Sequence, residues 1–188
     1  MKRFADSRHL GMSAAATIVF FAASAVAGAA EPRSDASPAE AIVKSLGVHG
    51  GLCVQVGAND VGGAAELAAT GRYLVHVLDG DEQAVERARG QLRATGLYGL
   101  VSADRLPRSG GLPYTENLVN LLFIAEDSAQ APLEEAMRVL CPNGILVVGA
   151  KKATADELES LGFAAVRQVG DGGEWLVGRK PWPGEMDE

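Results

Sequence analysis

The chain has 188 residues, of which 47% are hydrophobic, and this is enough for one domain with a sizeable core. Its formal net charge of −7 excludes the basic surface that general nucleic-acid binding requires, so we expect no nucleic-acid partner.

Residues 1–30 have the pattern of a secretory signal peptide. Lys2 and Arg3 form a basic start, Ser13 to Ala30 is an apolar run rich in alanine, and Ala27-Gly28-Ala29 fits a small-residue cleavage site. The alternative is an uncleaved N-terminal anchor, because the run approaches membrane-spanning length. The pattern predicts an exported protein, periplasmic or secreted, which contacts a membrane only if this segment stays uncleaved.

After a polar linker at residues 31–36, short apolar runs alternate with helix-forming segments over residues 37–180, and an acidic tail follows at 181–188. A capping box at Ser37-Pro38-Ala39-Glu40 begins a short first helix. The predicted strands are Leu52–Val56, Tyr73–Leu78, Tyr98–Ala103, Leu118–Ile124, Ile145–Val148, Phe163–Val169 and Glu174–Arg179. The predicted helices cover about 63–70, 81–95, 132–140 and 155–161.

Arg105 to Glu116 reads as a loop, and the glycine-rich turn at residues 170–173 joins the last two strands into a hairpin. Alternation of this kind predicts an α/β fold with helices on both faces of a doubly wound, mostly parallel seven-stranded sheet. The terminal hairpin adds its antiparallel strands.

Polar or small residues follow the carboxyl ends of the predicted parallel strands. They are Gly57, Asp79, Asp104 and the segment Ala125-Glu126-Asp127. Ligands of doubly wound sheets bind outside these strand ends. Gly57 can adopt backbone angles closed to other residues, and Asp79 stands where such folds place the acceptor for ribose hydroxyls. The spacing therefore predicts a nucleoside-binding site at this edge.

Four motifs resemble those of the class I S-adenosylmethionine-dependent methyltransferases of the type 11 kind. They are Val54-Gln55-Val56-Gly57-Ala58-Asn59, Val77-Leu78-Asp79-Gly80-Asp81, the run from Leu112 to Asn120, and the run from Glu135 to Gly144. The resemblance covers about Leu46 to Lys180. It implies the methyltransferase fold and S-adenosylmethionine as cofactor. The residues it implies for cofactor binding are Gly57, Ala58, Asn59, Asp79, Gly80, Ala103 and Asp104.

The resemblance does not identify the methyl acceptor, and we expect the partner to be either a small-molecule acceptor or an envelope protein. Glu126 and Asp127 lie where the family places substrate-facing or base residues, although a solvated loop that caps the next helix is an equal alternative. The tail after Lys180 resembles a linker, of the kind that joins such domains to quinone-type β-propellers in bacterial envelope proteins.

Several positions depart from the family pattern. Gln55 replaces the acid before the glycine loop, Asn59 and Val61 replace two glycines, Asn120 replaces an acid, and Pro142-Asn143-Gly144 replaces a Pro-Gly-Gly turn. Two hypotheses therefore remain: an active methyltransferase, or a catalytically degenerate domain that keeps the fold and serves as an accessory module in the cell envelope.

The remaining chemistry-bearing residues predict no further site. The three histidines are scattered, so we expect no metal centre. In the strand order that the resemblance implies, Cys53 and Cys141 lie two strands apart, about 9–10 Å. A disulfide needs Cα atoms within about 7 Å, so we expect two free thiols.

Overall fold

The computed structural model describes residue 43 and residues 46–109, 111–125, 133–170 and 172–184. The chain divides into two units, residues 1–34 and 35–188, and all described residues belong to the second. The predicted signal peptide and linker therefore lie outside the described residues. Of the first predicted helix, only Val43 and Leu46 are described, and both are helical. Within the described part of the chain, no helix is both long and apolar enough to cross a bilayer.

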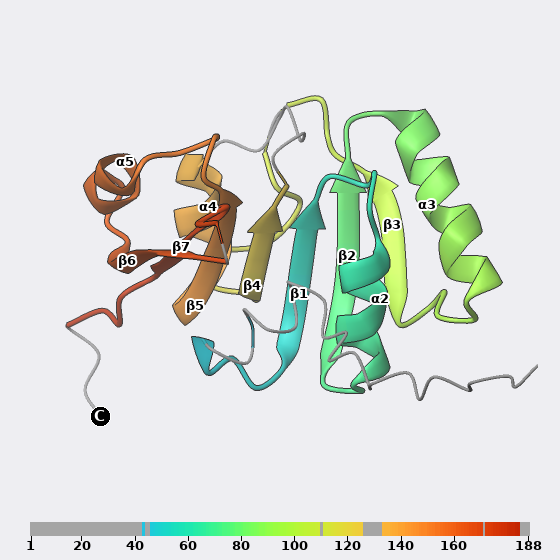
Figure 1. The fold of residues 1–188 in the computed structure, drawn as a ribbon, viewed down its shortest axis with the longest axis horizontal. Coiled ribbons are helices and arrows are strands. Elements are labelled where there is room, and N and C mark those ends of the chain that lie inside the picture. Colours follow the sequence, from blue (N-terminus) through green and yellow to red (C-terminus); the bar gives the residue numbers. More distant parts are fainter. Residues whose placement is uncertain (1–42, 44–45, 110, 126–132, 171, 185–188) are drawn as a thin grey trace, which may run out of the picture. The chain divides into compact units, whose positions relative to one another are not determined.

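Seven strands form one sheet in the order β3-β2-β1-β4-β5-β7-β6. The strands are β1 (Gly51–Val56), β2 (Tyr73–Asp79), β3 (Val101–Arg105), β4 (Val119–Ile124), β5 (Leu140–Gly149), β6 (Ala164–Val169) and β7 (Trp175–Arg179). Strands β1 to β5 pair in parallel, and β7 pairs antiparallel with β5 and β6 (Figure 1). The predicted doubly wound sheet with its terminal hairpin is confirmed.

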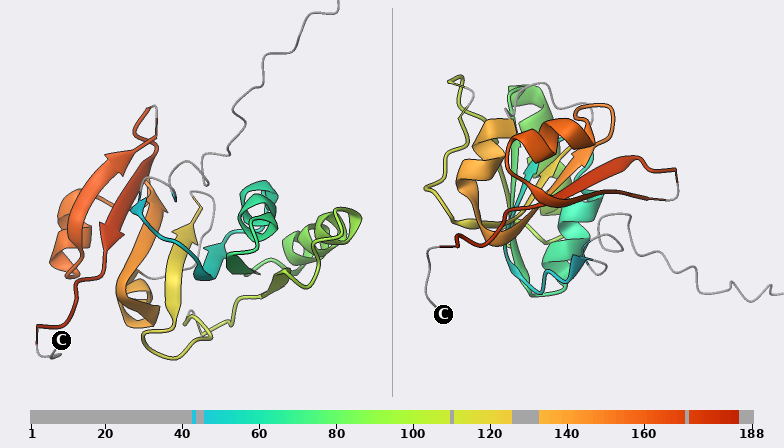
Figure 2. Two further views of the ribbon diagram at one scale, coloured as in Figure 1. Left: turned by 90° about the horizontal axis from the view of Figure 1, so that it is seen from below. Right: turned by 90° about the vertical axis from the view of Figure 1, so that its left-hand side faces the viewer.

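The helices pack on the two faces of this sheet. They are α2 (Gly62–Ala69), α3 (Glu82–Ala94), α4 (Leu133–Val139) and α5 (Ala155–Ser160). One core joins α2 and α3 to residues such as Val75 and Val77, and the other joins α4 and α5 to residues such as Leu146. The view along the sheet shows α2 and α3 on one side and α4 on the other (Figure 2). Both apolar faces of the central strands are thereby buried, as their nearly continuous hydrophobic sequences require.

Two strands differ from the sequence prediction. The third strand begins at Val101 rather than Tyr98, because the chain turns at Gly99, whose φ of 113° is accessible mainly to glycine. The fifth strand begins at Leu140 and runs through the Pro-Asn-Gly segment, where Asn143 takes a φ of 63°. Since asparagine tolerates left-handed angles, it fills the place of the family's glycine without breaking the turn.

The connection between β3 and β4 contains no helix in its described residues, which are 106–109 and 111–118. Its buried Leu106 and Leu112 cover Leu78 at the carboxyl end of β2. Leu74 points to the same face as Leu78, because side chains four residues apart in a strand share a side, yet it is 58% exposed. The described residues therefore cover this face of β2 at its carboxyl end and leave Leu74 largely exposed.

Cys53 and Cys141 are both free, as expected, because β4 lies between the strands that carry them. Burial raises the pKa of the Cys53 thiol to about 12, so this thiol stays protonated in the folded protein.

Candidate functional site

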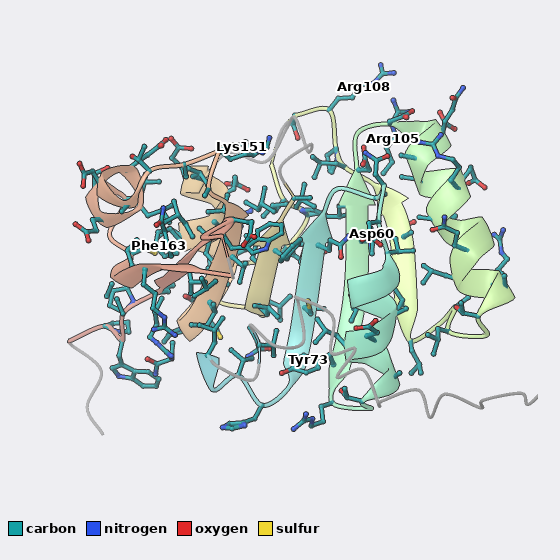
Figure 3. The ribbon with its side chains drawn as sticks, in the orientation of Figure 1. Asp60, Tyr73, Arg105, Arg108, Lys151 and Phe163 are labelled. Carbon is teal, nitrogen blue, oxygen red and sulfur yellow. The ribbon has the colours of Figure 1, made fainter. Side chains whose placement is uncertain are left out.

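The candidate site lies where the strand order reverses. From β1 the chain continues to β2 and β3 on one side, whereas β4 and β5 lie on the other. The Gly57 amide donates to the Leu78 carbonyl over 2.8 Å, and the Ala125 amide donates to the Val56 carbonyl over 3.0 Å. These contacts bring the ends of β1, β2 and β4 to one edge, which is where doubly wound sheets bind ligands. Figure 3 shows Asp60 beside this end of β1, and Tyr73 at the opposite edge.

The Asp79 carboxylate is held by two backbone amides at the tip of β2. Ala58 N–H donates to Oδ2 over 2.8 Å, and Asp81 N–H donates to Oδ1 over 2.9 Å. A carboxylate offers about four lone-pair positions, so each oxygen can still accept another hydrogen bond. Asp79 thus links the loop after β1 to the loop after β2, which begins at Gly80. Its orientation is fixed before any ligand arrives.

The loop after β1 is shaped by Gly57, whose φ of 110° lies in the region that favours glycine. Ala58 is buried beneath the loop, whereas Asn59 is exposed. Asn59 is not among the residues with positive φ, so this position does not need the glycine that the family pattern has there. The loop therefore keeps its turn despite the departure.

Gln55 is the buried polar side chain of this region, with 7% of its surface exposed. Its Nε2 donates to the Gly57 carbonyl over 2.8 Å and to the Asp60 carbonyl over 2.6 Å. Sequence reasoning treated Gln55 only as a lost acid. The structure shows that its amide braces the glycine loop from inside, a role that needs a hydrogen-bond donor and that a carboxylate cannot fill.

Asp60 covers the beginning of α2. Its Oδ1 accepts from the Gly62 amide over 2.8 Å, which places a negative charge at the positive end of the helix dipole. The sequence from Gly51 to Thr70 contains no lysine, arginine or histidine. The strand, loop and helix next to Asp79 therefore carry acidic charge only.

Asp104 lies inside β3 rather than directly after it, and its carboxylate is bound within the chain. Oδ2 contacts His76 Nε2 at 3.1 Å, and Oδ1 accepts from Arg89 Nη2 over 2.7 Å. Arg89 also donates from Nε to the Ala103 carbonyl over 2.7 Å. On its other side, the His76 ring contacts the Tyr114 hydroxyl through Nδ1 at 2.7 Å.

The chain of contacts through Tyr114, His76, Asp104 and Arg89 was missed by sequence reasoning, which treated the three histidines as scattered. Burial, and secondarily the Asp104 charge, raise the pKa of the Tyr114 hydroxyl above its ordinary value, so it remains a neutral donor or acceptor. The network fixes Asp104 and the backbone of Ala103, the two residues expected near an adenine.

No protein-family model matches the chain, and a search of curated proteins finds no match. Solved structures do match. A candidate S-adenosyl-L-methionine-dependent methyltransferase from Methanococcus maripaludis has a TM-score of 0.65 at 16% identity, covering 79% of this chain and 85% of that chain. A SAM-dependent methyltransferase from Aquifex aeolicus has a TM-score of 0.61 at 20% identity, covering 75% and 87%.

The chain has the fold of the class I methyltransferases. At these identities the likeness concerns the fold alone. The [4+2]-cyclase SpnF also matches, with a TM-score of 0.61 at 16% identity over 76% of this chain and 80% of that chain. The methyltransferase fold thus also occurs in a protein named for a different reaction, and function must be argued from the site.

Two motifs that carry the methyltransferase resemblance form one structural clamp. Glu135 of α4 accepts from the Leu112 amide over 2.9 Å, and Arg138 donates to the Leu112 and Tyr114 carbonyls over 2.9 and 2.7 Å. Arg138 also pairs with Glu135 at 2.7 Å. The hydrogen bond from Arg138, followed by the Leu112 amide, lowers the pKa of the Glu135 carboxyl. The clamp places Tyr114 against His76.

The catalytic candidates Glu126 and Asp127 lie outside the described residues. Among the residues that are described, no group of three or more histidine, cysteine, aspartate or glutamate side chains is placed to hold a metal ion. The structure thus brings together Gly57, Ala58, Asp79 and Gly80, and it places Ala103 and Asp104 one strand farther along.

Proposed function

We propose that this chain binds S-adenosylmethionine at the edge formed by β1, β2 and β3 and transfers its methyl group to an acceptor. The observation that carries the proposal is the Asp79 carboxylate, which two backbone amides hold beside Gly57 with lone pairs left for ribose hydroxyls. The fold supports it, since one structural neighbour, a geranyl diphosphate methyltransferase, was solved in complex with SAM.

The residues present fit the nucleoside part of this cofactor. Asp79 accepts from the ribose, Gly57 and Ala58 keep the backbone close to it, and Ala103 and Asp104 flank the base. Asn59 lies in the loop after β1, and Gly80 lies in the loop after β2. Bound S-adenosylmethionine would supply a methyl group on sulfonium, which is already a good leaving group, so the protein contributes mainly positioning. The acceptor would be a small molecule.

Calorimetric titration with S-adenosylhomocysteine tests the proposal. A charge-assisted hydrogen bond contributes about 1.5–3 kcal/mol, so Asp79→Asn, which removes the charge but keeps one acceptor oxygen, should weaken binding at least about tenfold. Asp156→Asn, which removes an exposed carboxylate from the first turn of α5, is the matched control and should bind like the wild type. Equal affinity of the two variants would place the ligand elsewhere.

The second candidate is a degenerate module that keeps the fold for interaction in the cell envelope. It is favoured by Gln55, whose amide fills the position of the family's acid, and by Asp60, which occupies the start of α2. Absence of S-adenosylhomocysteine binding at millimolar concentration, in protein that melts cooperatively, would support this candidate and reject the methyltransferase.

We also infer that the protein acts outside the cytoplasm. Its tail would connect it to a partner domain such as a β-propeller. The signal-like segment 1–30 supports this proposal. Fractionation of cells that express the full-length chain, with mass analysis of the N-terminus, is the measurement. Recovery of uncleaved protein from the cytoplasm would contradict export.

A further inference from the structure

We propose that this site selects adenine nucleosides whose ribose 5′ substituent carries no net negative charge, and that it rejects those with an anionic one. This inference rests on the proposed function, because it takes Asp79 as the ribose acceptor. In addition, the loop after β1 determines which chemical class of ligand the site admits. The amino-acid tail of S-adenosylmethionine adds little to the affinity of the site for this ligand.

The position of the 5′ substituent follows from the architecture. When the acid at the end of the second strand binds the ribose hydroxyls, the 5′ group lies at the loop after the first strand and the start of the following helix. In this chain that region is Gly57 to Gly62. An anion is bound there by unoccupied backbone amides and the helix dipole.

Three backbone amides of this region already donate hydrogen bonds within the chain. The amides of Gly57, Ala58 and Gly62 donate to the Leu78 carbonyl, to Asp79 and to Asp60, all over 2.8 Å. The carbonyls of Gly57 and Asp60 accept from Gln55. A phosphate or carboxylate that bound to these amides would have to displace these contacts.

The charge of the region opposes an anion as well. Asp60 places its carboxylate on the first amide of α2, where the anion would have to lie. No basic residue occurs between Gly51 and Thr70 to offset that charge. An ammonium group gains little either, because the uncharged Gln55 stands where the family's acid would be and its amide hydrogens point at the loop carbonyls.

Calorimetric titration of the full-length protein with three ligands provides the test. They share adenosine and differ at the 5′ carbon: 5′-methylthioadenosine is neutral, S-adenosylhomocysteine carries a zwitterionic tail, and adenosine 5′-monophosphate is an anion. We expect the first two to bind within about threefold of each other and the third to bind at least about tenfold more weakly.

Asp60→Asn is the matched variant, because its amide oxygen can still accept from Gly62 while the charge is gone. We expect it to strengthen binding of the monophosphate at least about tenfold and to leave the affinity for 5′-methylthioadenosine unchanged. An unchanged monophosphate affinity in this variant would overturn the role given to Asp60.

Two other results separate this inference from the proposed function. If S-adenosylhomocysteine binds more than about tenfold tighter than 5′-methylthioadenosine, the tail is recognised and the inference is wrong, while the proposed function stands. If none of the three ligands binds to folded protein, both are overturned.

Discussion

Gln55 shows how one side chain can change what a motif does. A carboxylate at this position would face the carbonyls of Gly57 and Asp60, which now accept at 2.8 and 2.6 Å. The glycine loop of this chain therefore depends on a neutral donor. The loop keeps its shape because the Gln55 amide donates to its carbonyls, whereas the family has an acid at this position.

We expect Gln55→Glu to lower the free energy of unfolding by about 1–3 kcal/mol at neutral pH, since it leaves a buried carboxylate opposite two carbonyl oxygens. Urea-induced unfolding measures this loss. Gln168→Glu, on the exposed side of β6, makes the same chemical change at the surface and should have little effect. Equal losses in the two variants would show that Gln55 does not brace the loop.

At the scale of elements, the Glu135–Arg138 clamp joins α4 to the connection before β4. Because the pKa of Glu135 is lowered in the folded protein, its stabilising contribution is present above the ordinary glutamate pKa of about 4.3 and is lost as the pH falls through the lowered value. The clamp is therefore sensitive to acid and insensitive to pH changes near neutrality.

We expect Glu135→Gln to lower the melting temperature at pH 7, and the difference from the wild type to shrink as the pH falls below about 4. Glu134→Gln removes the neighbouring, exposed carboxylate and should lack this pH dependence. Thermal melts from pH 7 to pH 3 are the measurement. A constant gap between Glu135→Gln and the wild type across this range would contradict the linkage.

The partly covered face of β2 provides a comparison within one strand. Leu78 is fully buried and Leu74 is 58% exposed, although both point to the same face. We expect Leu78→Ala to cost about 2–5 kcal/mol of unfolding free energy and Leu74→Ala less than about 1 kcal/mol. A large cost at Leu74, measured by urea unfolding, would indicate that another part of the protein covers this face.

Most of these elements could be predicted from the sequence, because apolar runs such as Ile145 to Val148 and the capping residues Asp81 and Thr154 act locally. Asp79 was found in the same way, as the acid that ends an apolar strand. The contact of His76 with Tyr114 and Asp104 could not be predicted, since it joins residues 38 and 28 positions apart. The role of Gln55 was missed because a donor is needed only once the loop has its three-dimensional shape.

At the scale of the whole molecule, the sheet described here belongs to residues 35–188. Strand β1 lies between β2 and β4, and β5 joins the parallel strands to the terminal hairpin. The helices that follow β1 and β4, which are α2 and α4, pack on opposite faces of the sheet, and the candidate site lies at the strand ends between them. The elements that form the candidate site therefore all belong to this unit.

We expect a chain that begins at Ser37 to fold by itself and to melt cooperatively, because the sequence predicts a capping box there that begins the first helix of the domain. Circular dichroism during heating is the measurement, with the full-length chain as the comparison. A longer chain that folds while the one starting at Ser37 does not would move the domain boundary towards the N-terminus.

The Arg89 contacts have a consequence for solubility. β3 is an edge strand of the sheet, and exposed edges are templates on which other chains can add a strand and polymerise. Arg89 occupies the Ala103 carbonyl of this strand and holds a charged guanidinium over it. Arg89, which also positions Asp104, thus places a charged side chain on this edge, and charged edge residues oppose the addition of strands from other chains. A substitution of Arg89 made to alter ligand binding would therefore also change how the protein associates with itself.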